Sequence, residues 1–289
     1  MPWSRIISAV VAIAVALTMI ILGGWYFTLG FGVIVFLGQL EIFRLVQAKG
    51  ILPATKTTLV VSQLILVTAH LAPPLADALL PLAGTFLCFY LLFQPQVATI
   101  ADVAASILGL FYGGYLPSFW IRLRDLGQVH HANLPLGGYW PTWPLDGQQL
   151  PQGLSLTLLA FACIWAADIG AYTAGKVIGR TPLSPISPRK TVEGAVFGMV
   201  ASTLVAMVGS HGLHWPLAPL SGIALGVMVG TSSLLGDLTE SLMKRDAGVK
   251  DSGDLIPGHG GILDRTDSYV FTGALVFYFV TLLLPLLGN

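Results

Sequence analysis

The sequence carries little charge for its length. Only 10% of its 289 residues are Asp, Glu, Lys or Arg, whereas 55% are hydrophobic, and a typical soluble domain has roughly 25% charged residues. Because a soluble domain of this size needs more charge to cover its exterior, a cytosolic globular enzyme is excluded. The 14 Lys and Arg are balanced by 14 Asp and Glu, so there is no basic surplus and we expect no nucleic acid as a partner. A polytopic membrane protein remains.

Cysteine is also scarce. Cys88 and Cys163 both lie inside apolar runs, where a thiol usually packs as a small hydrophobic side chain. They therefore indicate neither a disulfide nor a metal site. Residues 6–22 follow Arg5 and have the apolar core of a signal peptide, but no small-x-small cleavage site follows them. We therefore expect a retained first membrane helix.

Long apolar runs are abundant. Since a helix needs about 20 apolar residues to cross a bilayer, the sequence predicts an all-α polytopic integral membrane protein with about nine transmembrane helices. The predicted helices cover residues 6–23, 26–46, 57–73, 75–94, 98–121, 153–177, 193–213, 219–243 and 267–287. We expect three regions: scaffold helices over 1–125, a non-cytoplasmic interfacial loop over 126–152, and a transmembrane region with the functional site over 153–289.

The placement of Lys and Arg predicts the orientation of these helices. Basic residues gather in the connections after the second, sixth and eighth helices, which share one side, and the positive-inside rule assigns that side to the cytoplasm. These residues are Arg44, Lys49, Lys56, Lys176, Arg180, Arg189, Lys190, Lys244, Arg245, Lys250 and Arg265. Arg122 and Arg124 then fall on the opposite side, against the rule.

The charges are concentrated in two segments. Residues 168–193 and 237–267 hold eight of the 14 basic residues and nine of the 14 acidic ones. A charged side chain at the bilayer centre costs roughly 2.5–3.5 kcal/mol, so such residues are functional candidates. The two segments therefore predict the functional site, and the first 160 residues are expected to be mainly scaffold.

The first segment contains two clusters. Asp168, Tyr172 and Gly175 share one helical face because of their i, i+4, i+7 spacing, and the small residues between them allow a ligand or another backbone to approach. An aspartate bonded to a neighbouring helix is the alternative. In residues 187–194, Arg189 and Lys190 precede a helix start, which predicts an anion site. A basic loop that merely follows the positive-inside rule is the alternative there.

The second segment contains a third cluster. Asp237, Ser241 and Lys244 share one helical face, and Asp264 and Asp267 open the last helix at i, i+3 spacing. Carboxylates brought together at a membrane edge repel one another, so we expect a divalent metal, which takes oxygen ligands. Carboxylates that only complement a helix dipole are the alternative. The cations interleaved with these carboxylates favour a polyphosphate ligand.

The loop that follows Lys250 is rich in glycine. His259 lies among these glycines, where the backbone could wrap around an anion, although a simple hydrogen-bonding role is equally open. Metal and polyphosphate together indicate nucleotide chemistry, but the sequence has no GxxxxGK[ST] motif and no credible Rossmann context.

The third cluster closely resembles the signature of the phosphatidate cytidylyltransferases, or CDP-diacylglycerol synthases. The similar positions run from 241 to 267. Residues 168–176 are similar to the aspartate-Ala-Tyr-Gly element of that family, and residues 187–194 to its Ser-Pro-x-Lys-Thr-x-Glu-Gly element. The resemblance covers residues 160–289 well, and the N-terminal half mainly in hydropathy.

The resemblance implies an enzyme that makes CDP-diacylglycerol and pyrophosphate from CTP and phosphatidic acid with Mg²⁺. It implies that Asp237 and Asp264 are the leading metal ligands at the cytoplasmic membrane edge, with Asp267 and Asp168 as neighbours that are open as further ligands. A second cation, K⁺ or Mg²⁺, also stays open. The residues implied in catalysis are Asp237, Asp264, Lys244, Arg265 and Asp267. Those implied in substrate binding are Asp168, Tyr172, Ser187, Lys190, Glu193, Ser241, Arg245, Lys250, Asp251, His259, Gly260 and Gly261.

Several alternatives stay open. The implied reaction is an in-line attack of the lipid phosphate on the α-phosphorus of CTP, whereas a CTP-dependent polyprenol kinase would transfer the γ-phosphate and release CDP. A related CDP-lipid synthase is a further alternative within enzymes. An ion-coupled transporter that uses Asp168 and Asp237 belongs to another class and predicts inverted repeats. A homodimer is open, and the host membrane is either the cell (inner) membrane or an internal photosynthetic membrane.

Overall fold

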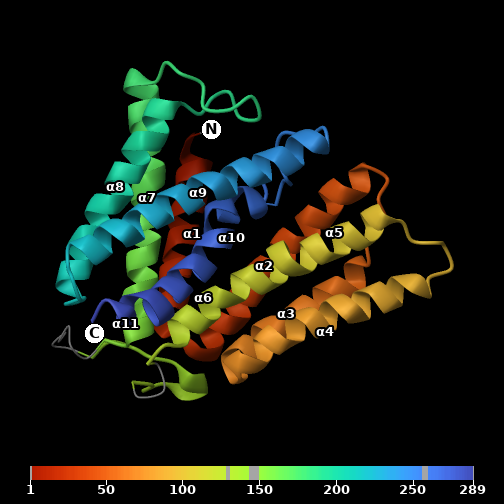
Figure 1. The fold of residues 1–289 in the computed structure, drawn as a ribbon, viewed down its shortest axis with the longest axis horizontal. Coiled ribbons are helices and arrows are strands. Elements are labelled where there is room, and N and C mark those ends of the chain that lie inside the picture. Colours follow the sequence, from red (N-terminus) through yellow and green to blue (C-terminus); the bar gives the residue numbers. More distant parts are fainter. Residues whose placement is uncertain (1, 128–130, 143–149, 256–259, 289) are drawn as a thin grey trace. The chain divides into compact units, whose positions relative to one another are not determined.

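The computed structural model describes residues 2–127, 131–142, 150–255 and 260–288. Helices dominate these residues, and none of the described residues lies in a β-strand (Figure 1). The N-terminal helices are α1 (Pro2–Leu22), α2 (Gly24–Ala48), α3 (Thr55–Leu71), α4 (Pro73–Leu92), α5 (Ile100–Leu110), the π-helix η1 (Phe111–Tyr115) and α6 (Leu116–Asp125). After the short η3 (Pro135–Gly137) come α7 (Gln152–Ile178), α8 (Val192–Gly212), α9 (Leu220–Asp246), α10 (Leu263–Tyr278), η5 (Phe279–Leu283) and α11 (Leu284–Leu286).

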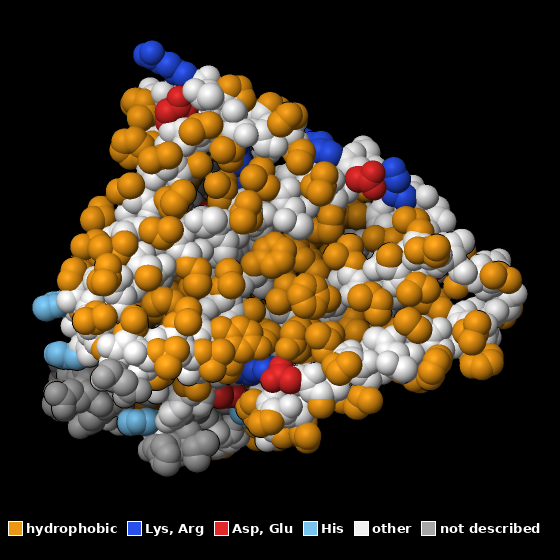
Figure 2. All heavy atoms as spheres, in the orientation of Figure 1, with side chains coloured by type: hydrophobic (Ala, Val, Ile, Leu, Met, Phe, Trp, Pro, Cys, Tyr) orange, Lys and Arg blue, Asp and Glu red, His pale blue; other side chains and the backbone are white. Residues whose placement is uncertain are grey.

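The helical segments follow the predicted apolar runs. Within the described chain, seven continuous segments are long and apolar enough to span a membrane. They are Gly24–Ala48, Pro73–Leu92, Ile100–Asp125, Gln152–Ile178, Val192–Gly212, Leu220–Asp246 and Leu263–Leu286. The other two runs coincide with α3, which has 17 residues, and with the apolar part of α1, Val10–Leu22. The chain is therefore an all-α polytopic membrane protein, as predicted, and hydrophobic side chains cover much of its visible surface (Figure 2).

The chain divides into two compact units. Unit 1 contains Met1–Leu154 together with Asp246–Thr266, and unit 2 contains Ser155–Arg245 together with Asp267–Asn289. The glycine-rich loop after α9 thus belongs with the N-terminal helices. The helix α10 contributes its first turn to unit 1 and the remainder to unit 2.

Close helix packing in unit 1 depends on small and polar residues. Helix α3 packs against α4, and it also contacts α2, η1 and α6. The buried Gln39 side chain on α2 donates from Nε2 to Ser62 Oγ on α3 and to the Gly109 carbonyl on α5, each at 2.8 Å. A Cβ on Gly114 would overlap the Ser62 side chain, so the glycine permits this close approach.

Arg122 and Arg124, at the end of α6, have internal partners in unit 1. The Nη1 atom of Arg122 donates to Asp77 Oδ1 at 2.8 Å. The fully buried Arg124 donates to the carbonyls of Ile20 at 2.5 Å and Ile21 at 2.8 Å, at the C-terminal end of α1. Helix C-terminal carbonyls attract cations. Both arginines thus form hydrogen bonds inside unit 1. The positive-inside rule concerns charges in exposed loops, so these two residues are weak evidence about the orientation of the helices.

The predicted interfacial loop over 126–152 is described only in part, because residues 128–130 and 143–149 lie outside the described chain. Asn133 and Trp140 exchange two hydrogen bonds, at 2.7 and 2.8 Å. The Tyr139 amide donates to the Leu22 carbonyl at 2.7 Å. These contacts order residues 133–140 against the end of α1.

Glycines also hold the helices of unit 2 together. A Cβ on Gly198 of α8 would lie 2.6 Å from the Ala167 carbonyl oxygen of α7, and a Cβ on Gly194 would lie 2.7 Å from the Ala171 carbonyl oxygen. Contacts under 3.0 Å do not occur for real Cβ atoms. The small residues of α7 therefore accommodate the backbone of α8. The sequence allowed either a ligand or another backbone to approach this segment.

Candidate functional site

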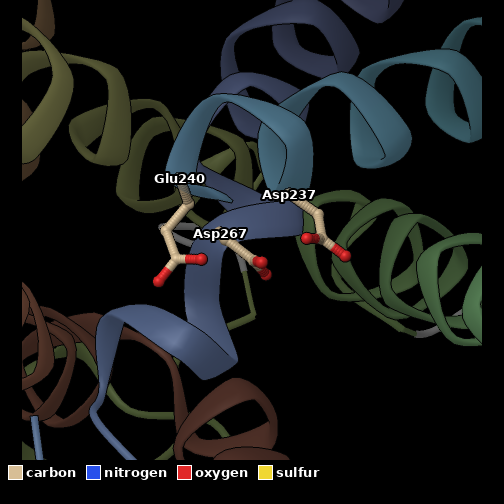
Figure 3. A group of neighbouring side chains, drawn as sticks. All are labelled: Asp237, Glu240 and Asp267. Atoms are coloured by element: carbon tan, nitrogen blue, oxygen red, sulfur yellow. The ribbon is translucent and has the colours of Figure 1, made fainter. Parts of the chain in front are cut away.

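Three carboxylates converge in unit 2. Asp237 and Glu240 lie one turn apart on α9, and Asp267 lies on α10. One carboxylate oxygen from each lies within 4.8 Å of the others, and Figure 3 shows all three side chains directed to the same side of α9. The approach of α10 depends on Gly236, because a Cβ at this position would overlap the Asp267 carbonyl oxygen. Local sequence thus brings Asp237 and Glu240 together, and Gly236 allows α10 to bring Asp267 beside them.

Two lysines accompany these carboxylates. The Nζ atom of Lys190, from the segment before α8, pairs with Asp237 Oδ2. Lys244 lies one turn after Glu240 on α9, and its Nζ is 2.5 Å from Glu240 Oε2. Glu240 is fully buried, Asp267 is 9% exposed, and the Asp237 side chain is 35% exposed. The cluster is therefore accessible from outside the protein on the side of Asp237.

The donor set fits a divalent cation. Three carboxylates face two ammonium groups, which leaves an excess of negative charge in a largely buried place, where like charges repel strongly. Hard divalent cations such as Mg²⁺ take oxygen ligands of this kind. Asp237, Glu240 and Asp267 could therefore hold such an ion.

Asp168 and Ser241 extend the site along α7 and α9. Ser233 Oγ, on α9 one turn before Asp237, donates to Asp168 Oδ1 at 3.4 Å. Ser241 Oγ donates to Asp237 Oδ1 at 3.4 Å. Both predicted site residues thus lie beside the carboxylate cluster. Tyr172 is 69% exposed and lies one turn further along α7.

The segment before α8 is organised by Glu193 and Thr191. Glu193 accepts hydrogen bonds from the Arg180 and Thr181 amides, each at 3.2 Å, and from Thr181 Oγ1 at 2.9 Å. Thr191 Oγ1 caps α8 by accepting from the Gly194 amide at 3.1 Å. These bonds fix the backbone on both sides of Lys190, whose amide donates to the Ser187 carbonyl at 3.0 Å. The contacts of Glu193 are therefore those of a residue that shapes this segment.

Asp264 organises the glycine-rich loop within unit 1. Its Oδ2 atom accepts from the Ser252 amide at 3.0 Å, from Ser252 Oγ at 3.1 Å and from the Gly261 amide at 2.8 Å. Gly260 has φ +85°, a conformation that L side chains rarely adopt. Both predicted loop glycines thus lie at the Asp264 carboxylate. His259 lies outside the described residues.

The four remaining predicted residues are exposed. They are Arg245, Lys250, Asp251 and Arg265. Arg245 lies in the last turn of α9, and Arg265 in the first turn of α10. Lys250 and Asp251 lead into the loop that Asp264 organises. Their exposure leaves them accessible to a soluble ligand.

Glu41 on α2 was not among the predicted site residues. It is 2% exposed and accepts hydrogen bonds from Ser252 Oγ at 2.8 Å, from the Ile262 amide at 3.0 Å and from the Leu263 amide at 2.9 Å. A sequence signal did exist, because an acidic residue inside an apolar membrane helix is a functional candidate by default. The prediction missed Glu41 because it followed the concentration of charge in the C-terminal half and treated the first 160 residues as scaffold.

Comparison with known proteins identifies the family. The sequence profile of the cytidylyltransferase family matches residues 3–283. A phosphatidate cytidylyltransferase of Synechocystis sp. is 60% identical over 292 residues, which cover 100% of both chains. The chloroplastic phosphatidate cytidylyltransferase 4 of Arabidopsis thaliana is 43% identical over 93% of this chain and 71% of its own. A phosphatidate cytidylyltransferase of Bacillus subtilis is 30% identical over 96% and 97%. The resemblance found in the sequence is confirmed, and the chain belongs to the cytidylyltransferase family.

Proposed function

We propose that the chain transfers the cytidylyl group of CTP to phosphatidic acid in the membrane and releases pyrophosphate, forming CDP-diacylglycerol. The observation that carries the proposal is the group of Asp237, Glu240 and Asp267, flanked by Lys190 and Lys244. It lies in a chain that is 60% identical along its whole length to a phosphatidate cytidylyltransferase. Acidic oxygens for a divalent cation, beside ammonium groups for phosphate, are what this reaction requires.

We propose Mg²⁺ as the cation, held by Asp237 with Asp267 and Glu240. When bound, it would neutralise phosphate oxygens and reduce the repulsion between two anionic substrates. Asp264, which lies one turn before Asp267 on α10, remains a further ligand predicted from the resemblance. A second cation, K⁺ or Mg²⁺, is likewise an untested prediction.

The reaction needs positioning more than proton transfer. An oxygen of the lipid phosphate attacks the α-phosphorus of CTP, a new P–O bond forms, and the bond to the β-phosphate breaks. The attacking oxygen is already an anion, so no general base is required, and alignment with charge neutralisation supplies the acceleration. We assign Lys190 and Lys244 to the phosphates, because their ammonium groups lie at the carboxylate cluster. A cation held there would bring the phosphates close to both lysines. Arg245, Lys250 and Arg265, all exposed, are assigned to the triphosphate.

We further propose that the site faces the cytoplasm, as the positive-inside rule predicts. CTP would then reach it from solution, and phosphatidic acid from the bilayer. The host membrane is the cell (inner) membrane or an internal photosynthetic one, and a homodimer remains an untested prediction.

A product assay tests the proposal. The purified protein is incubated with phosphatidic acid, α-³²P-labelled CTP and Mg²⁺, with and without chelator. We expect label in a lipid product, release of pyrophosphate, and loss of both with chelator. Label that stays in soluble CDP would indicate a lipid kinase instead. Absence of turnover by folded protein with several phosphatidates would refute the proposal and reopen the transporter alternative.

A further inference from the structure

The Glu41 carboxylate joins two stretches of chain that enclose the glycine-rich loop. Ser252 lies near the start of the loop, and Ile262 and Leu263 lie at the start of α10. Glu41 accepts one hydrogen bond from the first stretch and two from the second, at 2.8–3.0 Å. One side chain from α2 therefore fixes both ends of the loop.

The three donors around Glu41 suit a negatively charged side chain. Glu41 is 2% exposed, and a buried carboxylate is costly unless it is fully hydrogen-bonded. Charge-assisted hydrogen bonds from two backbone amides and a hydroxyl provide that compensation, and the N-terminus of α10 adds its dipole. Because Glu41 occupies the Ile262 and Leu263 amides, these two groups are not available to a substrate phosphate.

The loop is shaped around the Glu41 carboxylate. A Cβ on Gly253 would lie 2.7 Å from Glu41 Oε1, and a Cβ on Gly261 would overlap Glu41 Oε2. Neither glycine has positive φ, whereas Gly260 does. The space filled by the Glu41 carboxylate therefore favours glycine at 253, and the same carboxylate together with the Ser252 hydroxyl favours glycine at 261.

The contact continues to a predicted metal ligand. Ser252 Oγ lies 2.8 Å from Glu41 Oε2 and 3.1 Å from Asp264 Oδ2. Ser252 thus bridges the two carboxylates, and Asp264 in turn accepts from the Gly261 amide at 2.8 Å. A displacement of Glu41 would be transmitted to Asp264 through Ser252.

We propose that Glu41 is a positioning residue for catalysis. It sets the loop and the first turn of α10 so that Lys250, Asp264 and Arg265 are presented to the triphosphate of CTP. This inference depends on the proposed function, because the effect on CTP is the property that a purely structural role would not produce.

The decisive variant is Glu41→Gln, which preserves size but replaces one carboxylate oxygen by an NH₂ group. That group would face a backbone N–H donor in either orientation, the Ile262 amide at the Oε1 position or the Leu263 amide at the Oε2 position. Partners that orient ligating groups typically contribute about 10-fold to 100-fold to affinity or activity. We therefore expect the KM for CTP to rise at least about tenfold and the KM for phosphatidic acid to stay within about twofold. An unchanged KM for CTP in folded protein would overturn the proposal.

Gln39→Leu is the matched control. Gln39 lies on the same helix, is equally buried, and donates to Ser62 and Gly109 of the scaffold. We expect this variant to lower the melting temperature but leave the KM for CTP unchanged. If both variants raise that KM in proportion to their loss of stability, Glu41 has a structural role only.

A double-mutant cycle tests the contact without relying on one variant. Gly253→Ala introduces a Cβ whose nearest neighbours are all atoms of Glu41. We expect Gly253→Ala to raise the KM for CTP in the wild type and to add nothing in the Glu41→Ala background. Additive effects would overturn the proposal.

Protease cleavage separates failure of this inference from failure of the proposed function. Lys250 is exposed at the start of the loop, and trypsin cleavage reports how often the loop opens. We expect faster cleavage after Lys250 in Glu41→Gln than in Gln39→Leu, whatever reaction the protein catalyses. Equal cleavage rates would refute the positioning of the loop, whereas wild-type protein without cytidylyltransferase activity would refute the function instead.

Discussion

Replacement of Gly236 by alanine should strongly lower the activity of the enzyme, although every charged residue is retained. In α9 this glycine lies against the backbone of α10, and a Cβ would overlap the Asp267 carbonyl oxygen and lie 3.2 Å from its carbonyl carbon. Since the obstacle is backbone, the two helices have to separate by roughly 0.5–1 Å to restore ordinary contact. Overpacking of this kind typically costs about 1–3 kcal/mol of stability.

The functional effect should exceed the effect on stability. Separation of α9 from α10 moves Asp267 away from Asp237 and Glu240, which now lie within 4.8 Å. A misplacement of about 1 Å can cost about 100-fold in rate, and a looser ligand set should also raise the Mg²⁺ concentration needed for half-maximal activity. The assay is the CDP-diacylglycerol rate as a function of Mg²⁺, alongside a thermal melt.

Gly212→Ala is the control for this prediction. Gly212 ends α8, and a Cβ there would meet no atom within 4 Å, so its activity and Mg²⁺ dependence should match the wild type. If Gly236→Ala retains the wild-type rate and Mg²⁺ dependence, the carboxylate cluster is not the metal site.

Three further predictions follow from the contacts. Asp237→Asn should abolish turnover while the protein still folds, whereas Asp246→Asn, at the exposed end of the same helix, should leave the rate unchanged; a product assay on both compares them. Glu193→Ala removes the acceptor that holds Thr181, so kcat/KM should fall about tenfold, and restoration by Glu193→Gln would contradict an ionic role. A cysteine at 184, with both native cysteines replaced, should react with an impermeant reagent only from the cytoplasmic side, and labelling from outside would invert the topology.

Much of the helical architecture could be predicted from the sequence, because apolar runs of membrane length leave few alternatives to a helix. The i, i+4, i+7 spacing placed Asp237, Ser241 and Lys244 on one face of α9. The structure confirms a local bond between Ser241 and Asp237, and it adds Glu240, which pairs with Lys244. Such local relations follow from helix geometry alone.

Contacts between distant segments could not be predicted in this way. The pairing of Lys190 with Asp237 depends on how the segment before α8 folds back, which Glu193 and Thr191 determine through their hydrogen bonds. Glu41 lies 211 residues before its partner Ser252. Hydropathy identifies such a residue as unusual, but no periodic pattern names its partner.

The long separation between Glu41 and Ser252 also constrains how the protein is made. At a synthesis rate of about 5–20 residues per second, roughly 10–40 seconds pass between the emergence of α2 and that of the loop. During that interval α2 has been synthesised, but the Glu41 carboxylate lacks its final hydrogen-bond donors. These hydrogen bonds cannot form until residues 252–263 have been synthesised, so a nascent chain truncated before Ser252 leaves this acceptor without its donors.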